Sequence, residues 1–228
     1  MCGRYADFLE LQELMDAFVI DTVTESAAAH EPRFNIAPLQ DVRIVRVHQN
    51  QRVLDTARWG LVPRWAKDPS AAARTINARL ETASTKPSFR AAFASRRCGI
   101  PASGYYEWQS LPTGKTPHFI HPSDSAPLAM AGLYEAWRAT EAEPWLVTCS
   151  VLTTAASASL AQIHDRRPVM LSQDDVNAWL DPASDGEAAM AAALGQAPEL
   201  AWHPVSAAVG NVRNDYPELA QPATESLF

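Results

Sequence analysis

The sequence predicts an α+β fold, built as one β-rich unit, and three observations support this prediction. Runs of β-branched and aromatic residues recur through the middle of the chain, as is typical of strands. Apolar residues at helical spacing occur in only a few short segments. The 228 residues contain no internal repeat and no shift in composition that would mark a second domain.

Seven segments have the composition of strands, and together they predict that a sheet forms the middle of the protein. They are residues 42–47, 53–59, 104–109, 117–121, 128–133, 145–152 and 168–171.

Helices are expected mainly around this sheet. Apolar residues of segment 7–18 recur at helical spacing and predict an amphipathic helix just behind the N-terminus. Ser172 and Asp175 form a capping-box pattern for a helix through Leu180, which Asp181 and Pro182 would end. We also expect helices over residues 88–96, 154–162 and 187–194, and a surface loop over 21–31.

Composition excludes several classes of protein. No segment approaches the ~20 consecutive apolar residues of a membrane span, and the N-terminus lacks a secretory signal, so we expect a cytoplasmic protein. Cys2, Cys98 and Cys149 form no CxxC pair, and the six histidines show no ligand spacing. The sequence therefore predicts neither disulfides nor a metal site, and no cofactor is expected.

The net charge of −7 argues against binding to nucleic acid, because such proteins usually carry a basic surface. However, 16 of the 19 basic residues are arginines, which suit bidentate contacts to phosphate. Many of these arginines flank the motifs described below. A local basic groove on an acidic protein is compatible with this distribution.

Cys2 is the most informative position. Removal of Met1 would leave an amine and a thiol on adjacent carbons, a combination unique to an N-terminal cysteine. An α-amine with a pKa of about 8 can form an imine with an aldehyde near neutral pH, and the thiol can then close on the imine carbon. The product would be a five-membered thiazolidine. Taken alone, a cysteine at position 2 is more often an unremarkable chain start.

Three further side chains could support such chemistry. Strand alternation places Glu107 with Tyr105 and Gln109 on one face of segment 104–109, where partial burial would raise its pKa and suit it to proton transfer. His164 lies beside a carboxylate and two arginines, and Asn77 carries an amide that donates and accepts hydrogen bonds. Each of these residues alone has an ordinary structural explanation.

Ten ordered motifs make the chain similar to the SRAP family, the SOS response-associated peptidases known for sensing abasic sites. The similarity extends over nearly the whole chain. The motifs are MCGRYA at 1–6, RFNIAP at 33–38, WGLVPRWAKD at 59–68, INAR at 76–79, PSFRAAF at 87–93, RRCGIPASGYYEW at 96–108, AGLYEAW at 131–137, LTTAAS at 152–157, IHDRRPVML at 163–171 and VSAAVGNVRND at 205–215.

The resemblance implies a fold and a set of functional residues. The expected fold is a single domain over residues 1–228, with an antiparallel, barrel-like central sheet and peripheral helices. The implied catalytic residues are Cys2 as the crosslinking nucleophile, Asn77 as the orienting group, Glu107 as the acid/base and His164 as the proton shuttle. The implied DNA contacts are Arg4, Asn35, Pro38, Trp65, Arg79 and Arg166.

The resemblance also implies a partner, a bent single strand of DNA that contains an abasic site, bound by a monomer. The activity would be formation of a covalent DNA–protein crosslink, with abasic-site strand cleavage and removal of Met1 as associated activities. Arg167 and Gly210 depart from the family pattern, where we expect an apolar residue and an asparagine.

The sequence is also compatible with two other functions. One is an N-terminal-nucleophile cysteine peptidase, in which the Cys2 thiol attacks a peptide carbonyl. The other is a non-catalytic module that binds single-stranded DNA through arginine and tryptophan side chains, with Cys2 incidental. The first predicts a peptide product, and the second predicts binding without a covalent product.

Overall fold

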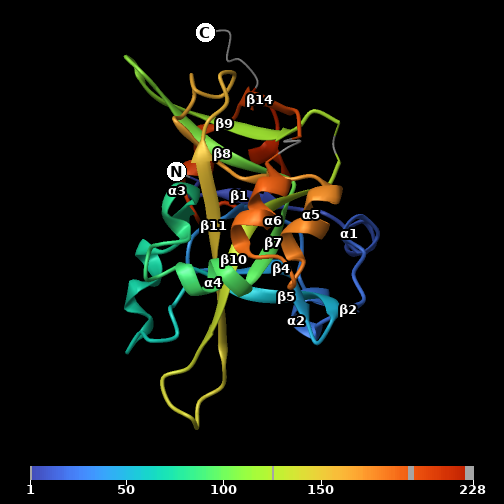
Figure 1. Cartoon of the computed structure of the whole chain (residues 1–228). Coiled ribbons are helices and arrows are strands. Elements are labelled where there is room, and N and C mark those ends of the chain that lie inside the picture. The colour runs from blue at the N-terminus through green and yellow to red at the C-terminus, as the bar shows by residue number, and fades with distance from the viewer. Residues whose placement is uncertain (1, 125, 195–197, 224–228) are drawn as a thin grey trace.

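The computed structural model describes residues 2–124, 126–194 and 198–223, which form one mixed α+β domain. Two sheets make up most of it, and helices lie around the larger sheet (Figure 1). The predicted fold class is therefore confirmed.

The larger sheet is curled and mostly antiparallel. Its strands occur in the order β12 (Arg166–Pro168), β11 (Leu146–Ala155), β10 (Leu128–Trp137), β7 (Arg97–Ala102), β4 (Asp41–His48), β5 (Gln51–Trp59) and β2 (Thr22–Val23). In addition, β13 (Met170–Leu171) pairs with β10, and β6 (Asn77–Arg79) pairs with β11. The sheet curls until β5 meets β11, but only two residue pairs join these strands. The expected barrel-like sheet is thus not closed into a true barrel.

The smaller sheet is antiparallel and carries the start of the chain. Its strands follow the order β14 (Leu200–Pro204), β9 (Gly114–Pro122), β8 (Gly104–Leu111), β1 (Tyr5–Asp7) and β3 (Arg33–Ile36). β1 therefore lies between β8 and β3. A buried apolar cluster that includes Cys2, Tyr5, Trp59 and Tyr105 fills the space between the two sheets.

Six helices complete the described part of the chain, together with three 3-10 helices. They are α1 (Leu11–Phe18), α2 (Glu25–Ala28), α3 (Leu80–Ala83), α4 (Arg90–Ser95), α5 (Gln173–Leu180) and α6 (Gly186–Ala193), with η1 (Pro69–Arg74), η2 (Ala207–Gly210) and η3 (Pro217–Ala220). α4 and α5 lie against the larger sheet, α6 packs on these two helices, and the β10–β11 hairpin projects away from the body (Figure 1). The capping box at the start of α5 is confirmed, because Ser172 and Asp175 exchange side-chain to backbone hydrogen bonds.

Two helix predictions need correction. The helix expected over 7–18 begins only at Leu11, because residues 5–7 pair with β8 and β3 as a strand. The helix expected over 154–162 is absent: β11 continues to Ala155, where it pairs with β12, and turns follow. In both cases pairing with distant strands outweighs the local spacing of apolar residues. The loop expected over 21–31 contains β2 and the short helix α2.

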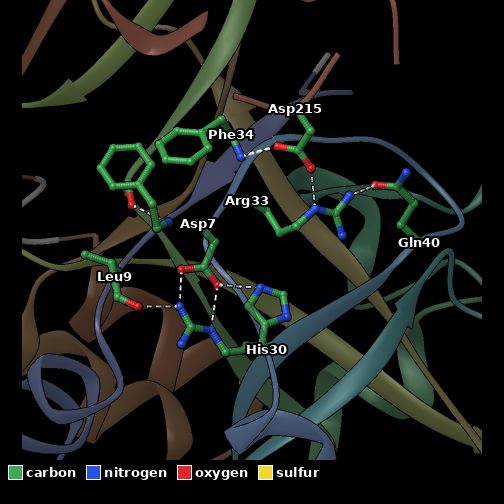
Figure 2. A network of polar contacts seen from close by, with 10 residues as sticks. Asp7, Leu9, His30, Arg33, Phe34, Gln40 and Asp215 are labelled. Atoms are coloured by element: carbon green, nitrogen blue, oxygen red, sulfur yellow. Dashed lines mark hydrogen bonds and ion pairs between the residues drawn. The ribbon is translucent and has the colours of Figure 1, made fainter. Parts of the chain in front are cut away.

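A buried ion pair holds the end of β1. The Arg43 guanidinium donates two hydrogen bonds to the Asp7 carboxylate, at 2.6 and 2.8 Å, and a third to the Leu9 carbonyl. Both charged side chains are almost fully buried. His30 adds a ring nitrogen 3.7 Å from the same carboxylate, as Figure 2 shows. Because a buried charge is costly unless it is paired, this arrangement constrains where β1 lies.

A second network joins the C-terminal segment to β3. Asp215 accepts a hydrogen bond from the Phe34 backbone N–H at 2.6 Å and forms an ion pair with Arg33, which also donates to Gln40 (Figure 2). The segment that contains η2 is held in addition by Asn35, whose side-chain amide donates to three backbone carbonyls of that segment. The first network holds β1 and the second holds β3, the strand paired with β1.

We predict that Asp7→Asn lowers the free energy of unfolding by about 3–5 kcal/mol, because it leaves the Arg43 charge buried without a counterion. Urea denaturation would measure the change. The matched control is Asp41→Asn, which removes an exposed partner of Arg58 at 3.5 Å and should cost less than about 1 kcal/mol. Equal losses for the two variants would contradict this account of β1.

Candidate active site

Cys2 is completely buried at the start of the chain, in the apolar cluster between the sheets. Its neighbour in this cluster, Tyr5, pairs with Ile36 and Tyr105 on the two adjacent strands and packs edge-on against Trp59. The strand that begins three residues after Cys2 is therefore firmly positioned on both sides. Met1 lies outside the described residues.

Asn77 connects Cys2 to the larger sheet. Its side-chain amide donates a 2.7 Å hydrogen bond to the Cys2 carbonyl. β6 holds Asn77 in place by pairing with Val151, and the Trp59 indole donates to the neighbouring Ile76 carbonyl at 2.8 Å. The Asn77 side-chain oxygen is buried and has no hydrogen-bond partner within the described part of the chain. This oxygen is available to accept a hydrogen bond from a group that approaches Cys2.

Glu107 projects from β8 toward the same place. Strand alternation divides the motif as expected: Tyr105 belongs to the cluster around Cys2, whereas Tyr106 packs with Phe119 on the opposite side. Only 4% of Glu107 is exposed. Burial raises the pKa of its carboxyl group, and the nearby His164 lowers that pKa by a smaller amount. Glu107 is thus a carboxyl group poised to exchange a proton closer to neutral pH.

His164 faces Glu107 from the turn before β12, with Nε2 4.0 Å from Oε2 of the carboxylate. Nδ1 accepts a hydrogen bond from the backbone N–H of Arg166 at 2.9 Å, and it also lies 3.2 Å from the Arg166 carbonyl oxygen. The exposed Asp165 carboxylate lies 3.0 Å from Nδ1. The geometry therefore suits proton exchange between His164 and Glu107.

The Cys2 thiol is protonated at neutral pH in this setting. Burial raises its pKa well above the ordinary value, and the Glu107 carboxylate raises it further, while a hydrogen bond from the Arg4 backbone opposes this rise only partly. A thiol of this kind becomes a nucleophile only when a base removes its proton.

The four residues that the resemblance implies as catalytic come from four separate parts of the chain. Asn77 contacts Cys2, the Glu107 carboxylate affects the pKa of the Cys2 thiol, and His164 lies 4.0 Å from Glu107.

Five of the six implied DNA contacts fall into two groups. Trp65 and Arg79 are exposed, and Pro38 is half-buried in the turn between β3 and β4. Arg4 and Asn35 are drawn inward: Arg4 donates to the Asn35 side chain and to the Val209 carbonyl, and Asn35 is fully buried. In this structure the Asn35 side chain therefore holds the C-terminal segment and offers no surface to a strand.

Arg166 is oriented by residues for which the sequence predicted no role. Its guanidinium donates to both carboxylate oxygens of Glu81, at 2.5 and 2.9 Å, and to the Thr153 carbonyl at 2.7 Å. Glu81 lies 85 positions from Arg166 in the sequence, so no local pattern links the two residues. Thr153 is brought near Arg166 only by the pairing of β11 with β12.

The two departures from the family pattern have different surroundings. A side chain at Gly210 would meet open space, so nothing in the fold requires glycine there. Arg167 is half-buried, and its charge opposes the rise of the Tyr105 pKa that burial causes. An extra cation therefore lies near a ring that lines the Cys2 cluster.

Comparison with known proteins decides the family. The family model for SOS response associated peptidase (SRAP) matches residues 1–212. The chain belongs to the SRAP family. Among relatives, the abasic site processing protein YoqW of Bacillus subtilis is 38% identical over 224 residues, covering 97% of this chain and 99% of YoqW. The abasic site processing protein YedK of Escherichia coli is 36% identical, covering 97% of this chain and all of YedK.

The fold of this chain also occurs in a solved structure. A crystal structure of a protein from Bacteroides thetaiotaomicron superposes with a TM-score of 0.85 over 98% of this chain and 100% of that protein, at 21% identity. Within the described residues, this SRAP chain has no helix long and apolar enough to cross a membrane. The same residues contain no group of three histidine, cysteine or acidic side chains able to hold a metal ion.

We predict that Glu107→Gln raises the melting temperature at pH 7.5. The folded-state pKa of Glu107 is raised, so its favourable contribution is fully present below about pH 4.5 and is lost as the pH rises through the folded-state value. The gain from the substitution should therefore disappear by about pH 4. Calorimetry at the two pH values would measure it.

Glu81→Gln is the control of opposite sign. Its hydrogen bond with Arg166 lowers the pKa of Glu81, so this carboxylate stabilises the fold above about pH 4.5. The control should lower the melting temperature slightly at pH 7.5. A Glu107→Gln protein that is less stable than wild type at pH 7.5 would mean that the Glu107 charge is favourably paired overall.

Proposed function

We propose that this SRAP protein processes abasic sites in single-stranded DNA by trapping the sugar aldehyde on Cys2 after removal of Met1. The observation that carries the proposal is the Asn77 hydrogen bond to the Cys2 carbonyl, which holds the chain start beside Glu107 and His164. The names of YoqW and YedK as abasic site processing proteins support the choice of lesion.

The chemistry proceeds in three balanced steps. The abasic sugar opens from its ring form to the aldehyde, with proton transfers to the ring oxygen and from the anomeric hydroxyl. The Cys2 amine then adds to the aldehyde carbon, and loss of water gives an imine. Finally the Cys2 sulfur bonds to the imine carbon while the nitrogen gains a proton, which closes a thiazolidine ring.

Glu107 and His164 supply the proton transfers that these steps require. Protonated Glu107 donates to the ring oxygen as the sugar opens, because its raised pKa retains the proton at higher pH than an ordinary carboxyl group. In the last step a base removes the proton of the Cys2 thiol, whose own pKa is raised by burial. His164, 4.0 Å from Glu107, passes the proton onward.

The DNA is held as a bent single strand by a monomer. Arg79 and Arg166 contact phosphates, and the exposed Trp65 ring stacks on a base, which stabilises single strands without regard to sequence. Arg4 approaches the strand from the side of Trp108, over which its guanidinium lies at 5.9 Å from the ring centroid. Pro38 shapes the path of the strand, and Asn35 acts through Arg4 by accepting its hydrogen bond.

The raised pKa of the Cys2 thiol weighs against the peptidase alternative. Cysteine peptidases attack as thiolates, and they lower the thiol pKa with a neighbouring cation. Here the Glu107 carboxylate raises the thiol pKa further, and this effect is larger than the opposing effect of the terminal amine. An amine that attacks first, followed by thiol closure, suits this environment better.

The experiment incubates wild-type protein with single-stranded DNA that carries one abasic site and resolves the products on a denaturing gel. We expect a heat-stable shifted band for wild type and none for Cys2→Ala, whose remaining amine would support strand cleavage only through an imine. Glu107→Gln should slow formation of the band by about 10²–10⁴-fold, the usual contribution of acid–base catalysis.

Cys98→Ala is the matched control, because Cys98 is equally buried but lies on β7. It should give the same band as wild type. Mass spectrometry must first establish that Met1 has been removed from each preparation. If a wild-type protein that begins at Cys2 gives no shifted band, covalent trapping is wrong.

A further inference from the structure

A basic pocket opens beside Asn77, on the side of the larger sheet where β6 pairs with β11. Its volume is about 430 Å³. It is lined by Ala73, Arg74, Ile76, Asn77, Arg79 and Lys86. One wall thus belongs to the residue that holds Cys2, and the remaining polar lining consists of three cations.

The charge of this pocket contrasts with that of the whole protein, which carries −7. Arg74, Arg79 and Lys86 are all exposed. Within the described ranges, none of the three side chains forms an ion pair or a hydrogen bond with the protein. The neighbouring carboxylate of Glu81 is already bound by Arg166 through two hydrogen bonds. Three cations therefore line one concave surface, and of these Arg79 also lies close enough to Glu81 to help lower the pKa of that carboxylate.

The backbone beneath these cations is well anchored. Arg74 ends η1, and the next residue, Thr75, is buried and donates a 2.6 Å hydrogen bond to the Leu61 carbonyl. The Ile76 carbonyl accepts hydrogen bonds from the Val151 N–H and the Trp59 indole. Lys86 donates its backbone N–H to Thr82 at 2.9 Å. The backbone positions from which the three cations extend are thus set by the fold.

These features are those of a site for a chain of phosphates. Arginine binds phosphate in a bidentate manner, and lysine binds it as a point charge. An abasic sugar retains a phosphodiester on each side, so a sugar at Cys2 brings a phosphate to the Asn77 end of the pocket. Arg74, Arg79 and Lys86 line the same pocket as Asn77, so the phosphates that follow the first one have cations within the same concavity.

We propose that this pocket binds the DNA strand next to the reacting sugar, and that Arg74 and Lys86 contact phosphates beyond the one held by Arg79. The inference rests on the proposed function for the identity of the ligand. It extends the binding surface to two residues outside the contacts implied by the family resemblance. It also explains how an acidic protein retains a polyanion near Cys2.

Salt dependence of binding tests the proposal. Undamaged, fluorescently labelled single-stranded DNA would be titrated with wild type, Arg74→Gln and Lys86→Gln at several salt concentrations between about 50 and 200 mM, with anisotropy as the readout. Each phosphate contact contributes about 0.7 to the slope of log affinity against log salt for a single strand. Each variant should reduce the slope by about that amount.

Arg58→Gln is the matched control, because Arg58 is an exposed arginine on β5 that does not line this pocket. It removes the same charge and should leave the slope unchanged. Unchanged slopes for Arg74→Gln and Lys86→Gln, or an equal fall for all three variants, would overturn the proposal, since only a local contact predicts the difference.

The crosslinking assay separates this inference from the proposed function. With abasic DNA, Arg58→Gln should form the shifted band as wild type does, whereas Arg74→Gln and Lys86→Gln should need a higher DNA concentration for half of the protein to be crosslinked. If wild type forms no crosslink but the slopes fall as expected, the pocket binds DNA and the trapping mechanism is wrong. If wild type crosslinks and the slopes do not change, the strand follows another path.

Discussion

The site depends on the position of β1, which carries Cys2 into the space between the two sheets. A strand of three residues cannot hold itself there, so the constraint comes from outside it. The Asp7–Arg43 ion pair fixes the far end of β1, and the Asn77 amide holds the Cys2 carbonyl at the near end. Both interactions join residues that are far apart in sequence, and together they hold the chain start between the two sheets.

Burial of Cys2 disfavours attack by its thiolate, as in a cysteine peptidase, and favours attack by its amine on an aldehyde. It suppresses the thiolate, which an ordinary cysteine nucleophile needs, and it places a carboxyl group with a raised pKa nearby. Both effects favour a reaction in which the amine reacts first and the thiol gives up its proton during ring closure. The charge distribution is consistent with this division, because the reacting groups are enclosed whereas the cations suited to phosphate lie outside, on an otherwise acidic surface.

Sequence patterns predicted most of the fold, because alternation and β-branched composition report directly on burial in strands. The patterns failed where a strand pairs with a partner that is distant in sequence. The strands at 5–7, 33–36 and 200–204 are too short or too polar to be recognised from composition. After residue 154 the apolar spacing predicted a helix, but β11 continues to Ala155. Chemistry alone singled out Cys2, and the motifs suggested Glu107, Asn77 and His164. No local pattern could show that Asn35 is buried, that Glu81 orients Arg166, or that Arg74 and Lys86 share a pocket with Asn77, since these depend on the packing of η1, α3 and β6.

The central claim is that the N-terminal amine and thiol of Cys2 both bond to the sugar of an abasic site. Mass spectrometry of the crosslinked protein, digested with trypsin after treatment with borohydride, tests it most directly. Our account predicts that the adduct lies on the peptide of residues 2–4, without Met1, and has a mass unchanged by borohydride, because a thiazolidine has no imine to reduce. An adduct on a lysine, or on a peptide that retains Met1, would contradict it.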